Sequence, residues 1–279
     1  MATTDQYTII GSLFPTRQAL RVIGGATDCA VQVDAAAVAA KADAKGTITA
    51  MVMLPVLTTA TGTILGFGDD DVVEYIQLHI NAGLLTLTLA DAATVDIIVQ
   101  ADAIEFKAHK WHHIAAVQDA VQPRLYVDGQ LIDTTNDDES GITKWGTALA
   151  GLDKGFIGCA NKAGDGSETE EFAGYISQVR YYDEAKTAAE IEAIYEYDAL
   201  GKGDNDTTDI RNHWKFTVDL LDSGAGADNG TAVAGAIVVD AANEFTSKLT
   251  FGMGVPVTAD NIKIAIDSGV GFAYLVQQA

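Results

Sequence analysis

The segment that most constrains the fold is 111–132, WHHIAAVQDAVQPRLYVDGQLI. Residues 111–117 are rich in aromatic and branched side chains that favour a strand, and 124–127 resume that pattern after a short run of turn-forming residues. Asp128-Gly129 is a dipeptide that prefers a two-residue hairpin turn. The segment therefore predicts consecutive antiparallel strands.

Side chains alternate between the two faces of a strand, and both faces of the first of these strands are largely apolar. A strand covered on both faces lies inside a layered β structure and not at its rim. The alternation also places His112 and His113 on opposite faces, so a regular strand does not let both bind one metal ion. The two faces are formed by Trp111, His113, Ala115 and Val117, and by His112, Ile114 and Ala116.

Further strands are predicted earlier in the chain, where apolar runs are separated by short polar or glycine-containing breaks. Their spacing of about 8 to 12 residues is typical of a β-sandwich. The expected strands are 46–54, 63–67, 72–80, 84–89 and 95–99.

A resemblance to a known family rests on several short motifs in a fixed order. They are WHHIA from Trp111, RLYVDG from Arg124, FIG from Phe156, FAGYISQVRYY from Phe172 and TAAEI from Thr187. Residues 19–201 resemble the laminin-G-like jelly-roll modules of the concanavalin A-like lectin/glucanase superfamily. The resemblance implies an all-β, antiparallel jelly-roll β-sandwich. It does not imply one function, because such modules bind sugars, proteins or calcium, or build surfaces.

One short helix is predicted at the C-terminal end of the sandwich. Thr187 is a suitable N-cap, and Glu190 stands three residues later to complete a capping box. Ile191, Ile194 and Tyr195 form one apolar stripe, which we expect to pack against the sandwich.

The domain boundaries are expected where composition changes. Gly201–Asp209 reads GKGDNDTTD, a polar and flexible linker. We therefore expect an N-terminal arm over 1–18, the sandwich over 19–203, and a small β domain for assembly over 204–279. Four or five strands are expected in the last region, and the candidates are 213–220, 232–239, 245–252 and 262–266; 272–276 is a further apolar segment that is expected to pack.

The charge balance excludes two classes of partner. The chain has 17 Lys and Arg against 39 Asp and Glu, a net charge of −22. A protein that binds nucleic acid or an anionic membrane needs a cationic surface, so neither is an expected partner. The sequence does not start with a secretory leader, and Cys29 and Cys159 are expected to be buried and unbridged.

Calcium is the one cation for which the sequence offers candidate ligands, because Ca²⁺ prefers carboxylate and carbonyl oxygens from loops. The candidates are Asp69, Asp70 and Asp71 in one connection and Asp165 in a glycine-rich loop. The alternative interpretation is that these carboxylates are simply solvated, as is usual in an acidic protein. No cofactor is required by either interpretation.

A sugar-binding site needs aromatic side chains beside polar loop groups, and the two glycan-binding candidates are Trp145 and Tyr182. The alternative is that both are core residues, as tryptophan usually is. His79, His109 and His213 are scattered and form no recognisable metal or catalytic pattern.

A glycosidase needs two acids that flank the scissile bond, and retaining β-glucanases of this superfamily carry them as Glu-x-Asp-x-(x-)Glu on one strand. Glu168, Glu170 and Glu171 come nearest, but Thr169 stands where an acid is required. We therefore expect no enzymatic activity.

The leading functional hypothesis is a structural protein of a surface assembly, with a bacteriophage head decoration or tail-associated protein as the preferred example. It predicts a homo-oligomer, made in the host cytoplasm and placed on the virion surface, that contacts other virion proteins through 1–18 and 204–279. The alternative is an extracellular or cell-surface adhesin that binds glycans. A glycan hydrolase is the third hypothesis.

Overall fold

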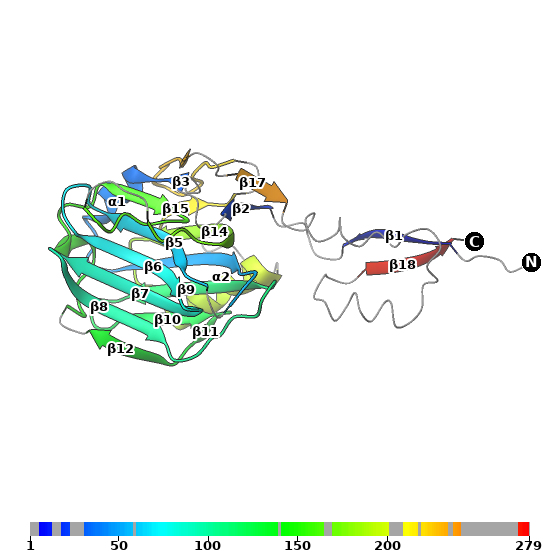
Figure 1. The fold of residues 1–279 in the computed structure, drawn as a ribbon, viewed down its shortest axis with the longest axis horizontal. Helices are drawn as coiled ribbons and strands as arrows, with labels where there is room; N and C mark the ends of the chain where they lie inside the picture. The colour runs from blue at the N-terminus through cyan, green and yellow to red at the C-terminus, as the bar shows by residue number, and fades with distance from the viewer. Residues whose placement is uncertain are drawn as a thin grey trace, which may run out of the picture. The chain divides into compact units, whose positions relative to one another are not determined.

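A computed structural model describes residues 6–12, 18–22, 31–57, 60–138, 141–164, 169–200, 209–216, 219–233, 237–240 and 273–278. It divides the chain into two units (Figure 1). One unit spans 19–238, and the other combines 1–18 with 239–279. In the described residues, no helix is long and apolar enough to cross a membrane.

Two antiparallel sheets form the larger unit (Figure 1). In order across the first sheet lie β11 (Gln130–Leu131), β10 (Arg124–Val127), β9 (Trp111–Gln118), β4 (Gly46–Met53), β14 (Gly174–Tyr182), β2 (Gln18–Val22) and β17 (Ile237–Asp240), and β15 (Ile210–Trp214) also pairs with β14. In order across the second sheet lie β12 (Thr134–Asp138), β8 (Thr94–Ala101), β7 (Leu84–Asp91), β6 (Tyr75–Asn81), β5 (Gly62–Gly68), β13 (Lys154–Ile157), β3 (Val31–Gln32) and β16 (Thr231–Ala232).

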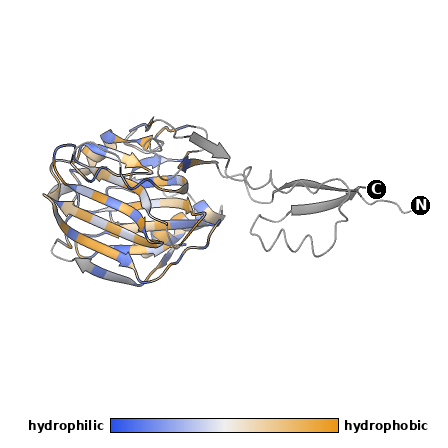
Figure 2. Ribbon diagram, in the orientation of Figure 1, coloured by the Kyte–Doolittle hydropathy of each residue, from blue (hydrophilic) through white to orange (hydrophobic). Residues whose placement is uncertain are grey.

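The core lies between the two sheets and is built by alternation along the strands. Ile76, Leu78 and Ile80 of β6 point into it, and Ile48 of β4 and Ile114 of β9 meet them from the other sheet. Hydrophobic and hydrophilic positions alternate along many strands of the sandwich (Figure 2). The predicted jelly-roll β-sandwich is thereby confirmed.

The predicted helix forms as α2 (Ala188–Leu200) and begins with the expected capping box. The Thr187 N–H donates to Glu190 Oε2 at 2.7 Å, and the Glu190 N–H donates to Thr187 Oγ1 at 3.3 Å. Ile191 and Ile194 are buried on the outer face of the first sheet, beside Val117 of β9. A second helix, α1 (Asp34–Ala40), and a short 3₁₀ turn (Gly146–Ala148) lie in connections.

The predicted hairpin turn is also present. Asp128 has φ of 50° and Gly129 has φ of 78°, and they join Val127 to Gln130 across β10 and β11. The Asp128 carboxylate accepts from the His113 N–H at 3.0 Å and from His112 Nδ1 at 2.8 Å. This Nδ1 carries the proton, because His112 Nε2 accepts from the Lys107 N–H. The turn is thus tied to β9 through one backbone N–H and one side chain of that strand.

The expected boundary after residue 203 is wrong, because the strands that follow the linker belong to the sandwich. β15 pairs with β14 from Val179↔Trp214 to Tyr182↔Ile210, and β16 pairs with β3. Trp214 and Phe216 are buried in the main core. A polar, glycine-rich linker marks a connection, but the burial of these aromatic residues decides which unit they join.

The smaller unit pairs the two ends of the chain. β1 (Gln6–Ser12) runs antiparallel to β18 (Ala273–Gln278), from Gln6↔Gln278 to Ser12↔Ala273. β18 includes most of the apolar segment 272–276, which was expected to pack. The strands expected at 245–252 and 262–266 lie outside the described residues.

Candidate functional site

The outer face of the second sheet carries polar side chains in regular register. β6 points Ile76, Leu78 and Ile80 into the core, so Gln77 and His79 lie on the opposite face. The strand pairing places residues of β5, β7 and β8 beside them. We call this surface the polar face, and its residues are Thr63, Tyr75, Gln77, His79, Thr86, Thr88 and Gln100.

A loop between β13 and β14 crosses one side of the polar face, where β5 presents glycines. A Cβ at Gly66 would lie 3.2 Å from the Ala160 Cβ, and one at Gly68 would lie 2.3 Å from the Asn161 carbonyl oxygen. The missing side chains therefore let 159–161 lie directly on β5. The loop turns back through two hydrogen bonds between Ala160 and Thr169, of 2.8 and 2.9 Å.

Glu170 ties this loop to the sheet. Its Oε2 accepts a hydrogen bond from Gln77 Nε2, which also donates to Thr63 Oγ1. Its Oε1 accepts from Lys162 Nζ at 2.7 Å, and that ammonium lies 5.3 Å from the centre of the Tyr75 ring. The ion pair and the amide thus fix the loop over β5 and β6.

Hydrogen bonds between side chains extend across the face toward β8. His79 Nε2 lies 3.0 Å from Thr88 Oγ1, and Gln100 Nε2 donates to Thr86 Oγ1 at 3.0 Å. His79 and Thr88 are each 7% exposed, whereas Gln100 is half-buried. Of the residues that define the polar face, only Gln100 of β8 is more than marginally exposed, so the accessible part of the face lies at β8.

Several buried atoms at this face have no hydrogen-bond partner among the described residues. They are Gln77 Oε1, His79 Nδ1, Asn161 Oδ1 and Asn161 Nδ2. His79 Nδ1 lies 4.0 Å from Glu170 Oε2, too far for a hydrogen bond. A buried polar atom without a partner costs about 1–3 kcal/mol. Four such atoms lie together here, beneath or beside the 159–161 segment, so a partner for them has to reach in at the edge of that segment.

Burial sets the ionisation of the two central groups. It lowers the pKa of His79 to about 4, although the Glu170 carboxylate partly offsets the effect. For Glu170, burial alone would raise the pKa, but hydrogen bonds from Lys162 and Gln77 outweigh it and lower that pKa. At neutral pH the face therefore contains a neutral imidazole and an ionised carboxylate.

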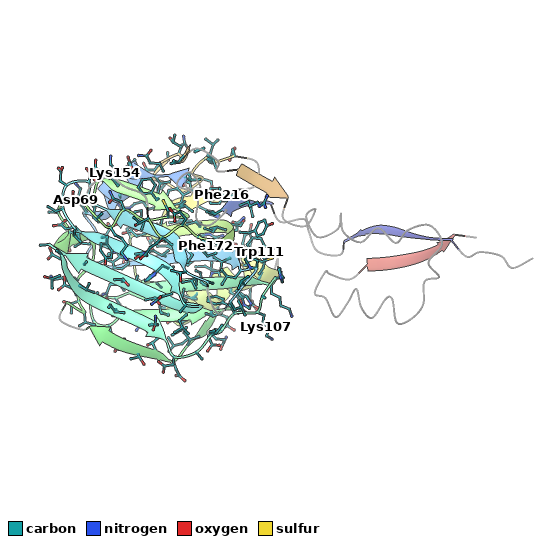
Figure 3. The ribbon with its side chains drawn as sticks, viewed as in Figure 1. Asp69, Lys107, Trp111, Lys154, Phe172 and Phe216 are labelled. Carbon is teal, nitrogen blue, oxygen red and sulfur yellow. The ribbon has the colours of Figure 1, made fainter. Side chains whose placement is uncertain are left out.

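Two of the predicted calcium ligands, Asp69 and Asp70, have carboxylates that already contact other groups of the protein. Asp69 is 6% exposed, and its Oδ1 accepts from the Asp71 N–H at 2.7 Å. The Asp70 carboxylate lies 3.4 Å from Lys154 Nζ, and Asp69 and Lys154 lie at the same end of the sandwich (Figure 3). No group of three or more metal-binding side chains is found in the described residues. Asp165 lies outside them, and calcium binding stays a prediction.

The two aromatic candidates are wrong as glycan platforms, because both are buried. Trp145 is 1% exposed, and its Nε1 donates to the Tyr181 hydroxyl at 3.3 Å. Tyr182 has no exposed surface and packs under α2, with Lys186 Nζ 4.7 Å from its ring centre. The core alternative holds for both, because Trp145 folds inward from its connection and Tyr182 is the last residue of β14, where α2 covers it.

The acidic string gives no catalytic pair among the described residues. Glu170 is held by Lys162 and Gln77, and Glu171 lies next to it on the loop. Glu168 lies outside the described part of the chain. Cys159 is buried beside Phe156, whereas Cys29 is not among the described residues, so its unbridged state stays a prediction.

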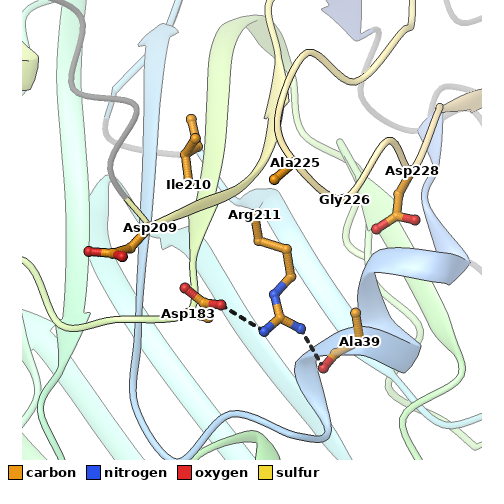
Figure 4. A pocket seen from close by; sticks show the side chains of 8 residues that line it. All are labelled: Ala39, Asp183, Asp209, Ile210, Arg211, Ala225, Gly226 and Asp228. Carbon is orange, nitrogen blue, oxygen red and sulfur yellow. Dashed lines mark hydrogen bonds and ion pairs between the residues drawn. The ribbon is translucent and has the colours of Figure 1, made fainter.

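A hollow with a volume of about 490 Å³ lies around Arg211, away from the polar face (Figure 4). Arg211 donates to the Ala39 carbonyl at 2.8 Å, to Asp43 at 2.7 Å and to Asp183 at 2.9 Å. Asp228 accepts from the Asn212 amide at 2.9 Å. The guanidinium thus has structural partners on several sides, which makes this pocket a weaker candidate than the polar face. Its lining residues are Ala39, Asp183, Asp209, Ile210, Arg211, Ala225, Gly226 and Asp228.

Comparisons with known proteins place the fold in a family. The model of the concanavalin A-like lectin/glucanase superfamily named Laminin_G_3 matches residues 25–192, more than half of the chain. The chain belongs to this superfamily. A search of curated proteins finds no match to the sequence.

Solved structures agree with the superfamily fold. A heptameric SAP-like pentraxin from Limulus polyphemus is 15% identical, with a TM-score of 0.54 over 81% of this chain and 96% of that one. The CBM40 of the Ruminococcus gnavus IT-sialidase, bound to α2,3 sialyllactose, is 21% identical, with a TM-score of 0.51 over 66% and 100%. A leech intramolecular trans-sialidase is 19% identical, with a TM-score of 0.51 over 64% and 28%. At these identities the likeness shows the fold alone.

Proposed function

We propose that the chain is a non-enzymatic glycan-binding module whose ligand contacts the polar face. The observation that carries the proposal is the set of buried polar atoms without partners at Gln77, His79 and Asn161. Proteins rarely leave such atoms unsatisfied, and a ligand that supplies the missing hydrogen bonds explains them.

The chemistry of these groups suits a sugar. An amide offers both donors and acceptors, and a neutral imidazole offers one of each. A sugar hydroxyl is likewise both donor and acceptor, so a cluster of hydroxyls can satisfy all of them. Membership of a lectin superfamily and the likeness to a carbohydrate-binding module support the same conclusion.

Absence of catalysis is part of the proposal. A glycosidase acid needs a raised pKa, so that it is protonated when the glycosidic oxygen requires a proton. The pKa of Glu170 is instead lowered by Lys162 and Gln77. An ionised, ion-paired carboxylate serves to hold the loop and not to donate a proton.

We further propose that the module works within a surface assembly, and a bacteriophage virion is the preferred setting. In this proposal the protein forms a homo-oligomer through the unit that the two chain ends build. The division into two units supports this view, because one unit builds a complete sandwich while β1 and β18 form a separate ribbon. A two-stranded ribbon is marginally stable alone and has reason to pair with a neighbour. The alternative setting is extracellular or at a cell surface.

The assembly is tested with the full-length protein by light scattering and by co-sedimentation with assembled particles. The proposal is supported if the protein self-associates, or if it is incorporated into particles and Thr8→Pro, which interrupts β1, abolishes that incorporation. A monomer that joins no particle contradicts the assembly role and leaves glycan binding to be tested separately.

Glycan binding is tested by comparing two buried asparagines. Asn161→Leu removes an amide that has no hydrogen-bond partner among the described residues, so the melting temperature should stay equal or rise. Two ligand hydrogen bonds of about 1 kcal/mol each are lost, which lowers the affinity about thirtyfold. The measurement is calorimetric titration with a glycan selected on an array.

Asn212→Leu is the matched control, because Asn212 Nδ2 donates to Asp222 and Asp228 within the protein, and only its Oδ1 has no partner among the described residues. It should lower the melting temperature and leave glycan affinity unchanged. Wild-type affinity in Asn161→Leu, or an array on which the full-length protein binds no glycan, contradicts the proposed function.

A further inference from the structure

We infer that the polar face selects uncharged glycans over anionic ones, an inference that rests on the proposed function and defines its ligand class. Anionic sugars carry a carboxylate or sulfate, which needs a positive partner when it is desolvated. The question is therefore whether the face has a cation to offer.

Lys162 is the cation nearest the unpartnered atoms, and it is already used. Its ammonium donates to Glu170 Oε1 at 2.7 Å and lies over the Tyr75 ring. Glu170 is held in turn by Gln77, so the carboxylate cannot move away without breaking a second hydrogen bond. An incoming anion would have to displace Glu170 from this pair.

Two more lysines belong to the second sheet or its edge, and both are paired with more than one acid. Lys154 of β13 lies 3.4 Å from Asp70 and 3.8 Å from Asp34. Lys144 lies 3.0 Å from Asp91 at the end of β7 and 2.9 Å from Asp96 of β8. Each of these ammonium groups is thus shared between two carboxylates.

The charge around the face is therefore negative. Three lysines meet the five carboxylates of Asp34, Asp70, Asp91, Asp96 and Glu170 in these pairs. His79 adds no positive charge at neutral pH, because it is neutral there. Among the described residues of this loop, 161–164 and 169–171, Lys162 is the one cation and Glu170 and Glu171 are acids.

An anionic ligand meets both repulsion and a lack of partners at such a surface. A neutral sugar avoids both costs, since its hydroxyls can bond to Gln77 Oε1, His79 Nδ1 and the Asn161 amide without a change in charge. The polar face thus differs in chemistry from a site that would hold the carboxylate of a sialyl group.

The experiment uses the full-length protein on an array of neutral, sialylated, sulfated and uronic acid-containing glycans. The array contains matched pairs whose members differ by one anionic residue or group, such as lactose and 3′-sialyllactose. The affinity for the neutral member of the bound pairs should exceed that for the anionic member at least tenfold, and added salt should narrow the difference. Equal or tighter binding of the anionic members overturns the inference and leaves the proposed function standing. No binding of any member overturns the proposed function itself.

Glu170→Gln provides the internal check, because it releases the Lys162 ammonium while keeping a side chain of the same shape. The ratio of anionic to neutral affinity should rise at least tenfold in this variant. An unchanged ratio, with the melting temperature close to that of the wild type, contradicts the role assigned to the ion pair.

Discussion

Two buried histidines should make the sandwich sensitive to mild acid. Burial lowers the pKa of His79 to about 4 and that of His213 to about 2, the latter helped by the neighbouring charges of Arg180 and Lys215. His213 Nε2 lies 2.7 Å from Gln178 Oε1, in the first sheet, and His79 lies in the second. The two groups therefore titrate independently.

The sign of the effect follows from proton linkage. An unfolded histidine has a pKa of about 6.5, so below that pH the unfolded chain binds a proton that the folded chain excludes. Stability is fully present above pH 6.5 and is lost as the pH falls, down to about 4 for His79 and about 2 for His213.

The magnitude can be worked out at pH 5. The unfolded histidine is there almost fully protonated and both folded ones are mainly neutral, so each site contributes a loss of about 2 kcal/mol relative to pH 8. The two sites together remove about 4 kcal/mol, a large part of the 5–15 kcal/mol that is typical for a domain.

The assay is urea denaturation between pH 5 and pH 8 on the wild type, His79→Gln, His213→Gln and the double variant. Each single variant should lose about 2 kcal/mol less than the wild type over this range, and the double variant about 4 kcal/mol less. His109→Gln, at an exposed position, is the control and should follow the wild type. Parallel curves for the wild type and the double variant would refute the reasoning.

Other predictions concern packing. Arg180→Met should lower the free energy of unfolding, measured by urea denaturation, by about 3–5 kcal/mol, because it leaves the buried Asp198 carboxylate without its guanidinium partner. The double variant that also carries Asp198→Leu should recover most of this loss. Trp145→Ala should lower the free energy of unfolding by about 3–5 kcal/mol, because it opens a cavity in the core, and it should leave glycan affinity unchanged. A variant with wild-type stability and reduced glycan affinity would contradict the burial of Trp145. Gly129→Ala should lower the melting temperature, because φ is 78° and the new Cβ would meet Tyr195 at 3.0 Å; an unchanged value would contradict the turn geometry.

Much of the fold could be predicted because its signals are local. Alternation in 72–80 and 111–117, the Asp128-Gly129 turn and the Thr187–Glu190 capping box each involve neighbours in sequence, and each has its expected place. The boundary after 203 failed because the burial of Trp214 depends on packing with a distant strand.

The site was harder to predict because its contacts are long-range. The Asp69–Asp71 run gives no sign that Lys154 lies beside it, and Trp145 gives no sign that it folds inward. Gln77 and His79 alternate with apolar residues in sequence, which is the signal that could have placed them on an outer face. That the loop containing Asn161 covers β5 depends on distant glycines and could not be foreseen.

The most direct test of the polar face as the ligand site is an NMR titration of full-length, isotope-labelled protein with its best-binding neutral glycan, followed through side-chain amide signals. We predict large shifts for Gln77 and Asn161, a smaller one for Gln100, and none for Asn212. The account would be contradicted if the signals of Asn212 and of residues around Arg211 shifted while the side-chain amide signals of Gln77 and Asn161 stayed unchanged.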